Sequence, residues 1–418
     1  MNHLLAHLQS ALGIAAIVGL AWATSENRSA FRWRIVAGGL GLQFLLAVVL
    51  LKVPPARQLL FGLNGVVTGL TDATRAGSSF VFGFVGGGAA PFAVTNPAGL
   101  TTLAFGILPL VMVISALSAI LWHWGILGAV VRVIAYVLRR VMGIGGAVGL
   151  GAAATVFLGN IEGPLVIRPY LARMTRTELF ILMTTGLAVI AGTVFVLYAT
   201  ILTPVLPGAL GHLLVASMMS LPAAIMLARL MVPGNADTDH GGKTGSEYRS
   251  TMDALADGTE KGLKIYLQII AMLLVTVALV ALVNIALSHL PPLDGAPLTL
   301  ERVLGWLFAP VVWLYGVPWG EAVTAGGLMG TKIVLNELIA YLDFAHMPAG
   351  TLDPRATQIM VYAMCGFANL ASVGILIAGM SALVPARRDE IVPLALKALL
   401  SGAMASGLSG CVIGLLPL

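Results

Sequence analysis

Long apolar segments separated by short polar ones run through the whole chain. A helix that crosses a bilayer needs about 20 mostly apolar residues, so this pattern predicts a polytopic membrane protein. We predict transmembrane helices at residues 12–24, 36–53, 103–138, 177–202, 212–230, 265–287, 358–383 and 393–415. The helix at 358–383 is predicted to be interrupted around residues 367–372. Charges spaced among apolar residues at 54–79 predict helices at the membrane surface, and the polar stretches at 86–97 and 233–264 predict loops.

Two further apolar regions are interrupted by acidic and amide residues. They lie at residues 143–171 and 320–344. The first contains Asn160, Glu162 and Pro164, and the second contains Asn336 and Glu337. Proline lacks a backbone donor and disfavours helix at the residue before it, so the backbone is expected to turn. Non-helical backbone at membrane depth is tolerated only beside protein or a water-filled cavity. We therefore predict two re-entrant hairpins whose acidic tips face one polar cavity.

Arginine clusters give the predicted topology a consistent direction. They lie at residues 28–34, 139–140, 168–176 and 387–388. All of them fall on one side of the scheme, which is the cytoplasmic side by the positive-inside rule, and both termini lie outside. The order helix, hairpin, helix, helix occurs twice with an odd number of full spans in each copy. The predicted fold is an all-α membrane protein of eight transmembrane helices and two hairpins in an inverted repeat.

Composition excludes several classes of protein. Of the 418 residues, 58% are hydrophobic and 10% are charged, which is outside the range of ordinary soluble domains. The net charge of +5 is spread over loops without a basic block, so we expect no nucleic-acid partner. Cys365 and Cys411 both fall in apolar segments, which argues against a disulfide framework. We expect no cofactor, and no phosphate-binding loop supports transport driven by ATP.

The polar residues inside the apolar segments are the candidate functional residues. A carboxylate near the bilayer centre costs about 2.5–3.5 kcal/mol, so Glu162 and Glu337 are functional candidates by default. With Asn369 and Ser372 they suit a neutral solute that carries hydroxyls or a heterocycle. A buried polar group left unpaired costs about 1–3 kcal/mol, so such a site rejects solutes without matching groups. The alternatives are salt bridges for the two glutamates and helix–helix hydrogen bonds for Asn369 and Ser372.

Two other functional classes were weighed. Gly407-Leu408-Ser409-Gly410 matches the short Gly-x-Ser-Gly pattern of rhomboid-like serine proteases. That reaction needs a histidine base near the serine, and residues 358–415 contain no histidine. Close packing between helices explains the small residues of this segment better. We therefore expect that the protein is not an enzyme. A channel is the remaining alternative, but two one-sided hairpins suit a closed site with alternating access better than a continuous pore.

Three motifs in order carry a resemblance to a known family. They are Gly159-x-x-Glu162-x-Pro164-Leu165-x-Ile167-Arg168-Pro169-Tyr170, then Val317-Pro318-Trp319 with Thr331-Lys332-x-Val334-Leu335-Asn336-Glu337, then Cys365-Gly366-Phe367-Ala368-Asn369-x-x-Ser372. In these motifs the chain resembles the bacterial branch of the concentrative nucleoside transporters, from about residue 4 to its end. The resemblance implies a homotrimer in lipid, in the bacterial inner membrane, that imports nucleosides with a cation gradient. It also implies a scaffold domain (1–138 and 265–300) and a transport domain (139–264 and 301–418) that moves like an elevator.

The resemblance also assigns roles to individual residues. The first hairpin and the helix at 177–202 would contact the nucleobase, through Asn160, Ile161, Glu162 and Val194. The second hairpin and the helix at 358–383 would contact the ribose, through Glu337, Phe367, Asn369 and Ser372. For Phe367 the alternative is packing against lipid.

Two departures from the family pattern matter for specificity and coupling. Many sodium-coupled relatives have Gln-Thr where this chain has Asn160 and Ile161. The Asn side chain is one methylene shorter than Gln, and the Ile side chain makes no hydrogen bond to a base. The preference of the protein for purine or pyrimidine nucleosides therefore stays open. The positions that match the family's cation site are Thr155, Leu158, Val189 and Ile190. A hard cation needs several oxygen ligands and Val189 has no side-chain oxygen, so we expect H⁺ rather than Na⁺ as coupling ion, carried by Glu162 or Glu337. Sodium coupling is the alternative.

Overall fold

The computed structural model describes residues 3–95, 102–236, 248–293 and 295–416. Within these ranges the regular structure is helical, apart from one isolated β-bridge between Leu293 and Ala296, so the predicted all-α class is confirmed. Seven described helical segments are long and apolar enough to cross a membrane, and the bent pair Leu300–Tyr315 and Trp319–Val334 would add an eighth. The protein is therefore a multi-pass membrane protein. Parts of the predicted loops at 86–97 and 233–264 lie outside the described residues.

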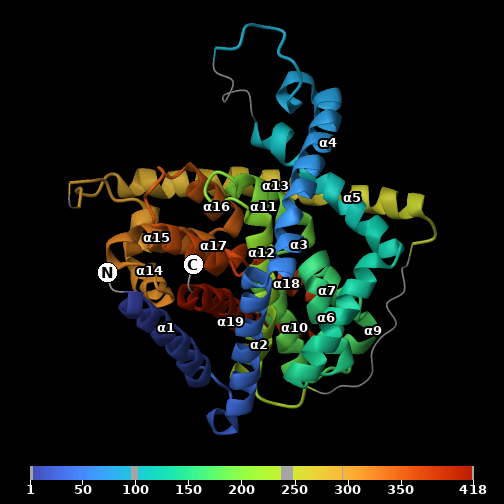
Figure 1. Ribbon diagram of the computed structural model, residues 1–418, viewed down its shortest axis with the longest axis vertical. Helices are drawn as coiled ribbons and strands as arrows, with labels where there is room; N and C mark the ends of the chain where they lie inside the picture. Colours follow the sequence, from blue (N-terminus) through green and yellow to red (C-terminus); the bar gives the residue numbers. More distant parts are fainter. Residues whose placement is uncertain (1–2, 96–101, 237–247, 294, 417–418) are drawn as a thin grey trace.

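The helices fall into three successive parts of the chain. The N-terminal helices are α1 (His3–Ala23), α2 (Trp33–Lys52), α3 (Pro54–Gly62) and α4 (Asn64–Phe82). The middle of the chain contains α5 (Pro109–His123), α6 (Ile126–Met142), α7 (Gly146–Leu158), α8 (Glu162–Leu165), α9 (Arg168–Leu171), α10 (Arg176–Ala188), α11 (Gly192–Leu202) and α12 (Ala209–Met231). The C-terminal part contains α13 (Thr251–Leu287), α14 (Leu300–Tyr315), α15 (Trp319–Val334), α16 (Glu337–His346), α17 (Pro354–Met364), α18 (Leu370–Leu383) and α19 (Arg388–Leu415). In Figure 1, α6, α7 and α9 lie on one side of α10, α12 and α18, and α14 to α16 lie on the other.

Three predicted helices differ from the observed ones. The prediction of one helix at 103–138 is wrong, because α5 ends at His123 and Gly125, with φ of 77°, turns the chain before α6. Glycine adopts this left-handed conformation without a steric penalty. The predicted helix at 177–202 is broken between Ala188 and Gly192, and the predicted helix at 265–287 begins earlier, as the 37-residue α13.

The two broken helices meet at their breaks. The Val189 carbonyl, just after α10, accepts a 3.2 Å hydrogen bond from the Phe367 amide in the gap between α17 and α18. A Cβ on Gly366 would lie 2.7 Å from the Ala188 carbonyl oxygen, so only glycine permits this approach. A helix end leaves backbone groups without intrahelical partners, and here each break supplies partners for the other.

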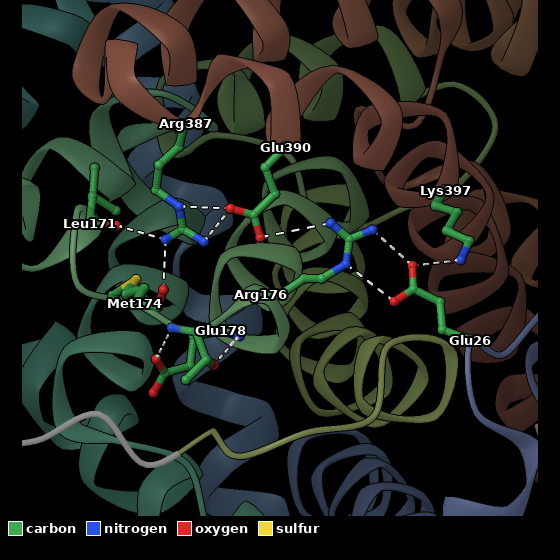
Figure 2. A network of polar contacts seen from close by, with 9 residues as sticks. Glu26, Leu171, Met174, Arg176, Glu178, Arg387, Glu390 and Lys397 are labelled. Carbon is green, nitrogen blue, oxygen red and sulfur yellow. Dashed lines mark hydrogen bonds and ion pairs between the residues drawn. The ribbon is translucent and has the colours of Figure 1, made fainter.

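Residues of three predicted cytoplasmic loops, among them two arginines, form one network of polar contacts (Figure 2). Arg176, at the start of α10, binds Glu26 at 2.9 Å and approaches Glu390 of α19 at 3.8 Å. Arg387 binds Glu390 at 2.5 Å and donates to the carbonyl of Met174 at 2.7 Å. This gathering agrees with the predicted topology, in which these loops share one side of the membrane.

Both ends of the chain lie at another common place. Arg355, at the start of α17, donates to the carbonyls of Ala6, Gly316 and Gly414 at 3.0, 2.6 and 2.7 Å. It therefore joins the start of α1, the end of α19 and the turn between α14 and α15.

Candidate functional site

The two hairpin tips and the two helix breaks line one cavity of about 250 Å³. All eight residues predicted to contact substrate line it: Asn160, Ile161, Glu162, Val194, Glu337, Phe367, Asn369 and Ser372. Ligand pockets usually measure about 300–1,000 Å³, so this cavity lies just below the usual range and has room for a small molecule only. Glu162 and Glu337 are therefore neighbours across a single chamber, as the hairpin prediction requires.

The second hairpin turns at Asn336 and presents Glu337 to the cavity. The Asn336 side chain caps α16 by accepting a 2.9 Å hydrogen bond from the Ile339 amide, which fixes where the helix begins. Glu337 is then the first residue of α16 and is 4% exposed. Its Oε1 accepts a 2.7 Å hydrogen bond from the Tyr198 hydroxyl, and its Oε2 accepts a 2.9 Å hydrogen bond from the Asn369 side-chain amide.

Asn369 connects this carboxylate to α18. Its Oδ1 accepts a 2.7 Å hydrogen bond from the Ser372 amide and so caps α18, while its Nδ2 binds Glu337. The first turns of α16 and α18 both lie at the cavity, which receives the positive ends of two helix dipoles. An ionised carboxylate has about four acceptor positions, and two are used here, so Glu337 can accept hydrogen bonds from two substrate hydroxyls.

The first hairpin needs glycine at its turn. Gly159 has φ of 117°, and a Cβ there would lie 2.7 Å from Oε2 of Glu162, so the backbone shape and the space for the carboxylate both require glycine. Ile161 packs on α18, where a Cβ on Gly379 would lie 2.5 Å from Ile161 Cδ1. The tip of the first hairpin is thus seated directly on the helix that Asn369 caps.

A second cavity of about 640 Å³ adjoins the first. Both cavities are lined by Leu158, Glu162, Thr193 and Ile265. The larger one also has Arg168, Asp253, Asp257 and Lys261 on its wall, residues for which the sequence predicts the cytoplasmic side. Glu162 therefore borders both the candidate substrate site and a polar vestibule.

Family models match along the chain. Those described as "Na+ dependent nucleoside transporter" match residues 12–85 (N-terminus) and 212–414 (C-terminus), and one described as "Nucleoside recognition" matches residues 104–205. An uncharacterized transporter of Bacillus subtilis, YutK, is 37% identical over 97% of this chain and 98% of its own length. The chain belongs to the nucleoside transporter family. This membership confirms the resemblance found in the motifs.

Named members of the nucleoside transporter family are similar over nearly the whole chain. The nucleoside permease NupC of Helicobacter pylori is 33% identical over 98% of this chain and 97% of its own length. The solved structure of CNTnw in an inward-facing substrate-bound state is 34% identical and superimposes with a TM-score of 0.88, over 98% of this chain and 97% of that one. These relatives are transporters and permeases, so the expectation that the chain is not an enzyme is confirmed.

The positions that match the cation site of sodium-coupled family members are only partly collected. Thr155, Val189 and Ile190 are fully buried, while Leu158 lines the cavity. The Thr155 hydroxyl donates to the Gly151 carbonyl at 2.8 Å, and the Val189 carbonyl already accepts from Phe367. Within the described ranges, no group of three or more His, Cys, Asp or Glu could hold a metal ion.

Tyr198 and Gln268 are among the cavity residues that were missed in the sequence. Tyr198 donates to Glu337, and its signal is its place one helical turn after Val194, on the same face of α11. Gln268 lines the cavity from α13, and its signal is an amide inside an apolar helix. Neither belongs to a motif, so only the placement of the helices identifies them.

Proposed function

We propose that this protein imports nucleosides across the bacterial inner membrane, driven by a cation gradient, with both termini outside the cytoplasm. The observation that carries the proposal is the Glu337 carboxylate, held by Tyr198 and Asn369 at one small cavity. A fixed acceptor of this kind suits the paired hydroxyls of a ribose. Family membership gives the same substrate class, since the relatives include a nucleoside permease and sodium/nucleoside cotransporters.

The opposite wall suits a nucleobase. Asn160 offers a carbonyl and an amide group, and Glu162 offers acceptors, to the polar edge of a base. Ile161 and Val194 offer apolar surface to its face. We propose ribose contacts from Glu337, Phe367, Asn369 and Ser372 and base contacts from this wall. Because Ile161 makes no hydrogen bond, one donor or acceptor on the base must be satisfied by Asn160, Glu162 or water.

The proposed coupling ion is H⁺, carried by Glu162 or Glu337. Val189 contributes no side-chain oxygen and its carbonyl is engaged by Phe367, which leaves few ligands for a hard cation. Glu162 borders both cavities, so a proton could reach it from the vestibule. The alternative, a sodium-coupled symporter, is favoured by the family description and by the rat relative "Sodium/nucleoside cotransporter 1", which is 32% identical.

The proposed mechanism is alternating access by an elevator-like shift between a scaffold (1–138 and 265–300) and a transport domain (139–264 and 301–418) of a homotrimer. The packing of α13 on α5 adjusts this division, because Gly258 and Gly262 of α13 fall within residues 139–264 but pack on α5 of the scaffold, so we place all of α13 in the scaffold. A Cβ on Gly258 would lie 2.8 Å from Cα of Ala116, and one on Gly262 would lie 2.7 Å from Cα of Met112. Small residues of this kind let two helices approach closely in lipid.

Uptake of labelled uridine and adenosine into proteoliposomes tests the proposal. An inward proton gradient and an inward sodium gradient are imposed separately, with the membrane voltage clamped. We expect saturable accumulation with the proton gradient alone, and counterflow of labelled substrate without any gradient. Accumulation with sodium alone would overturn proton coupling and keep nucleoside transport, whereas the absence of both uptake and counterflow would overturn the function. Unsaturable conductance would instead indicate a channel.

A further inference from the structure

A lysine is buried beside the candidate site without touching the cavity. Lys332 lies near the end of α15 and is 0% exposed. Among the described residues, none offers its Nζ a hydrogen bond. An ammonium group without an acceptor is costly in an apolar interior, so a nearby negative charge is needed to explain its place.

Glu337 is that charge. It follows Lys332 by five residues, across the hairpin turn from the end of α15 to the start of α16, and it is 4% exposed, so both charged groups are buried on the two sides of one turn. The hydrogen-bond partners of the Glu337 carboxylate, Tyr198 and Asn369, are neutral. Tyr198 and Asn369 orient the two carboxylate oxygens of Glu337 but do not balance its negative charge. Lys332 is left to balance that charge.

Other titratable groups face Glu337 from the surrounding helices. They are Tyr198 on α11, Tyr341 on α16, Cys365 after α17 and, across the cavity, Glu162. None of these four becomes a cation. Among the described groups named here, Lys332 is therefore the one that can bring a positive charge to Glu337.

We propose that Lys332 is a positioning residue that keeps Glu337 ionised in the empty and the loaded carrier. The proposal rests on the proposed function, in which Glu337 accepts ribose hydroxyls. An ionised carboxylate accepts hydrogen bonds with both oxygens, whereas a protonated one gives up acceptor capacity to its own O–H. On this proposal the proton of the coupled step is carried by Glu162.

Uridine binding by the purified protein tests the role of Lys332 through its pH dependence. The dissociation constants of the wild type, Lys332→Met, Lys332→Arg and Lys264→Met are measured between about pH 6 and pH 9. Lys264 is the matched control, because it is exposed on α13 and paired with Glu260. We expect the affinity loss of Lys332→Met relative to the wild type to be at least about tenfold larger at the acidic end than at the alkaline end, which corresponds to one pKa unit. Lys332→Arg and Lys264→Met are expected to follow the wild type.

An affinity loss of Lys332→Met that is the same at every pH would mean a structural role and would overturn the proposal. Infrared difference spectra of the substrate-free protein give a second test that needs neither a Lys332 variant nor a nucleoside. The wild type minus Glu337→Gln spectrum at about pH 6 is expected to lack the stretch of a protonated carboxyl group. If that band is present, Glu337 is neutral and the proposal fails. A wild type that binds no nucleoside would overturn the proposed function, and the infrared result would still decide the charge of Glu337.

Discussion

The side-chain amide of Asn369 donates a 2.9 Å hydrogen bond to Oε2 of Glu337, across 32 residues of sequence. Through this contact the cap of α18 and the first residue of α16 hold each other at the cavity. The same asparagine accepts a 2.7 Å hydrogen bond from the Ser372 amide. One side chain thus fixes both the start of a helix and the direction of the acidic group.

These two contacts of Asn369 can be separated by substitution. Serine is a good cap but is too short to reach Glu337, so Asn369→Ser should keep the stability of the protein and weaken uridine binding about tenfold to a hundredfold, the value of a hydrogen bond to a charged group. Asn369→Ala should weaken binding similarly and also cost about 1 kcal/mol for the lost cap. Isothermal titration and thermal unfolding measure the two effects. Equal melting temperatures for the two variants would contradict the capping role.

The Tyr198 hydroxyl should contribute to substrate binding through Glu337. Tyr198→Phe removes the 2.7 Å hydrogen bond to Oε1 and should lower uridine affinity about tenfold. Tyr341→Phe is the matched control, because its ring packs 5.4 Å from that of Tyr198 and its hydroxyl binds the Val361 carbonyl instead. The control should lose stability and keep affinity. A loss of affinity in both variants alike would indicate a general packing effect.

The packing of Ile161 against Gly379 of α18 should be sensitive to the addition of a single methyl group at Gly379. In Gly379→Ala the new Cβ would lie 2.5 Å from Ile161 Cδ1, which displaces the tip of the first hairpin and should lower uridine uptake at least about tenfold. Gly374→Ala, on the same helix, meets no atom within 4 Å and should leave uptake unchanged. Normal uptake by Gly379→Ala would show that the tip does not depend on this contact.

The polar network at the arginine-rich end should stabilise the fold in a pH-dependent way. The hydrogen bond from Arg176 lowers the pKa of Glu26, and Lys397 binds the same carboxylate at 3.0 Å (Figure 2). A lowered pKa means that the stabilisation is present above the pKa of the unfolded chain and is lost as the pH falls through that of the folded one. Glu26→Gln should cost about 0.2–1 kcal/mol per exposed pair at neutral pH and nothing in strong acid. The control is Glu260→Gln, which breaks a single ion pair with Lys264 on α13 that is more exposed to solvent. This control should lower the melting temperature less than Glu26→Gln does. An equal decrease in the two variants would contradict a stabilising role of the network around Glu26.

Most of the helices, and eight of the residues that line the cavity, could be predicted because each has a local signal. Apolar length identifies the spans, and Asn160, Glu162, Asn336 and Glu337 stand out in segments that otherwise suit lipid. The break after α10 could not be predicted, because residues 187–191 are uniformly apolar. It depends instead on the distant amide of Phe367 and on Gly192, where a Cβ would lie 2.7 Å from the Phe157 carbonyl oxygen. Tyr198 could not be predicted as a site residue for the same reason, because its hydrogen-bond partner, Glu337, is 139 residues away in the sequence.

The central claim is that a nucleoside binds in the cavity through ribose hydroxyls held by Glu337. The most direct test compares uridine with 2′,3′-dideoxyuridine in binding to the purified wild type and to Glu337→Gln. The wild type should prefer uridine at least about tenfold, and Glu337→Gln should bind the two compounds nearly equally, because the charged acceptor of both hydroxyls is gone. An undiminished preference for uridine in Glu337→Gln would contradict the account.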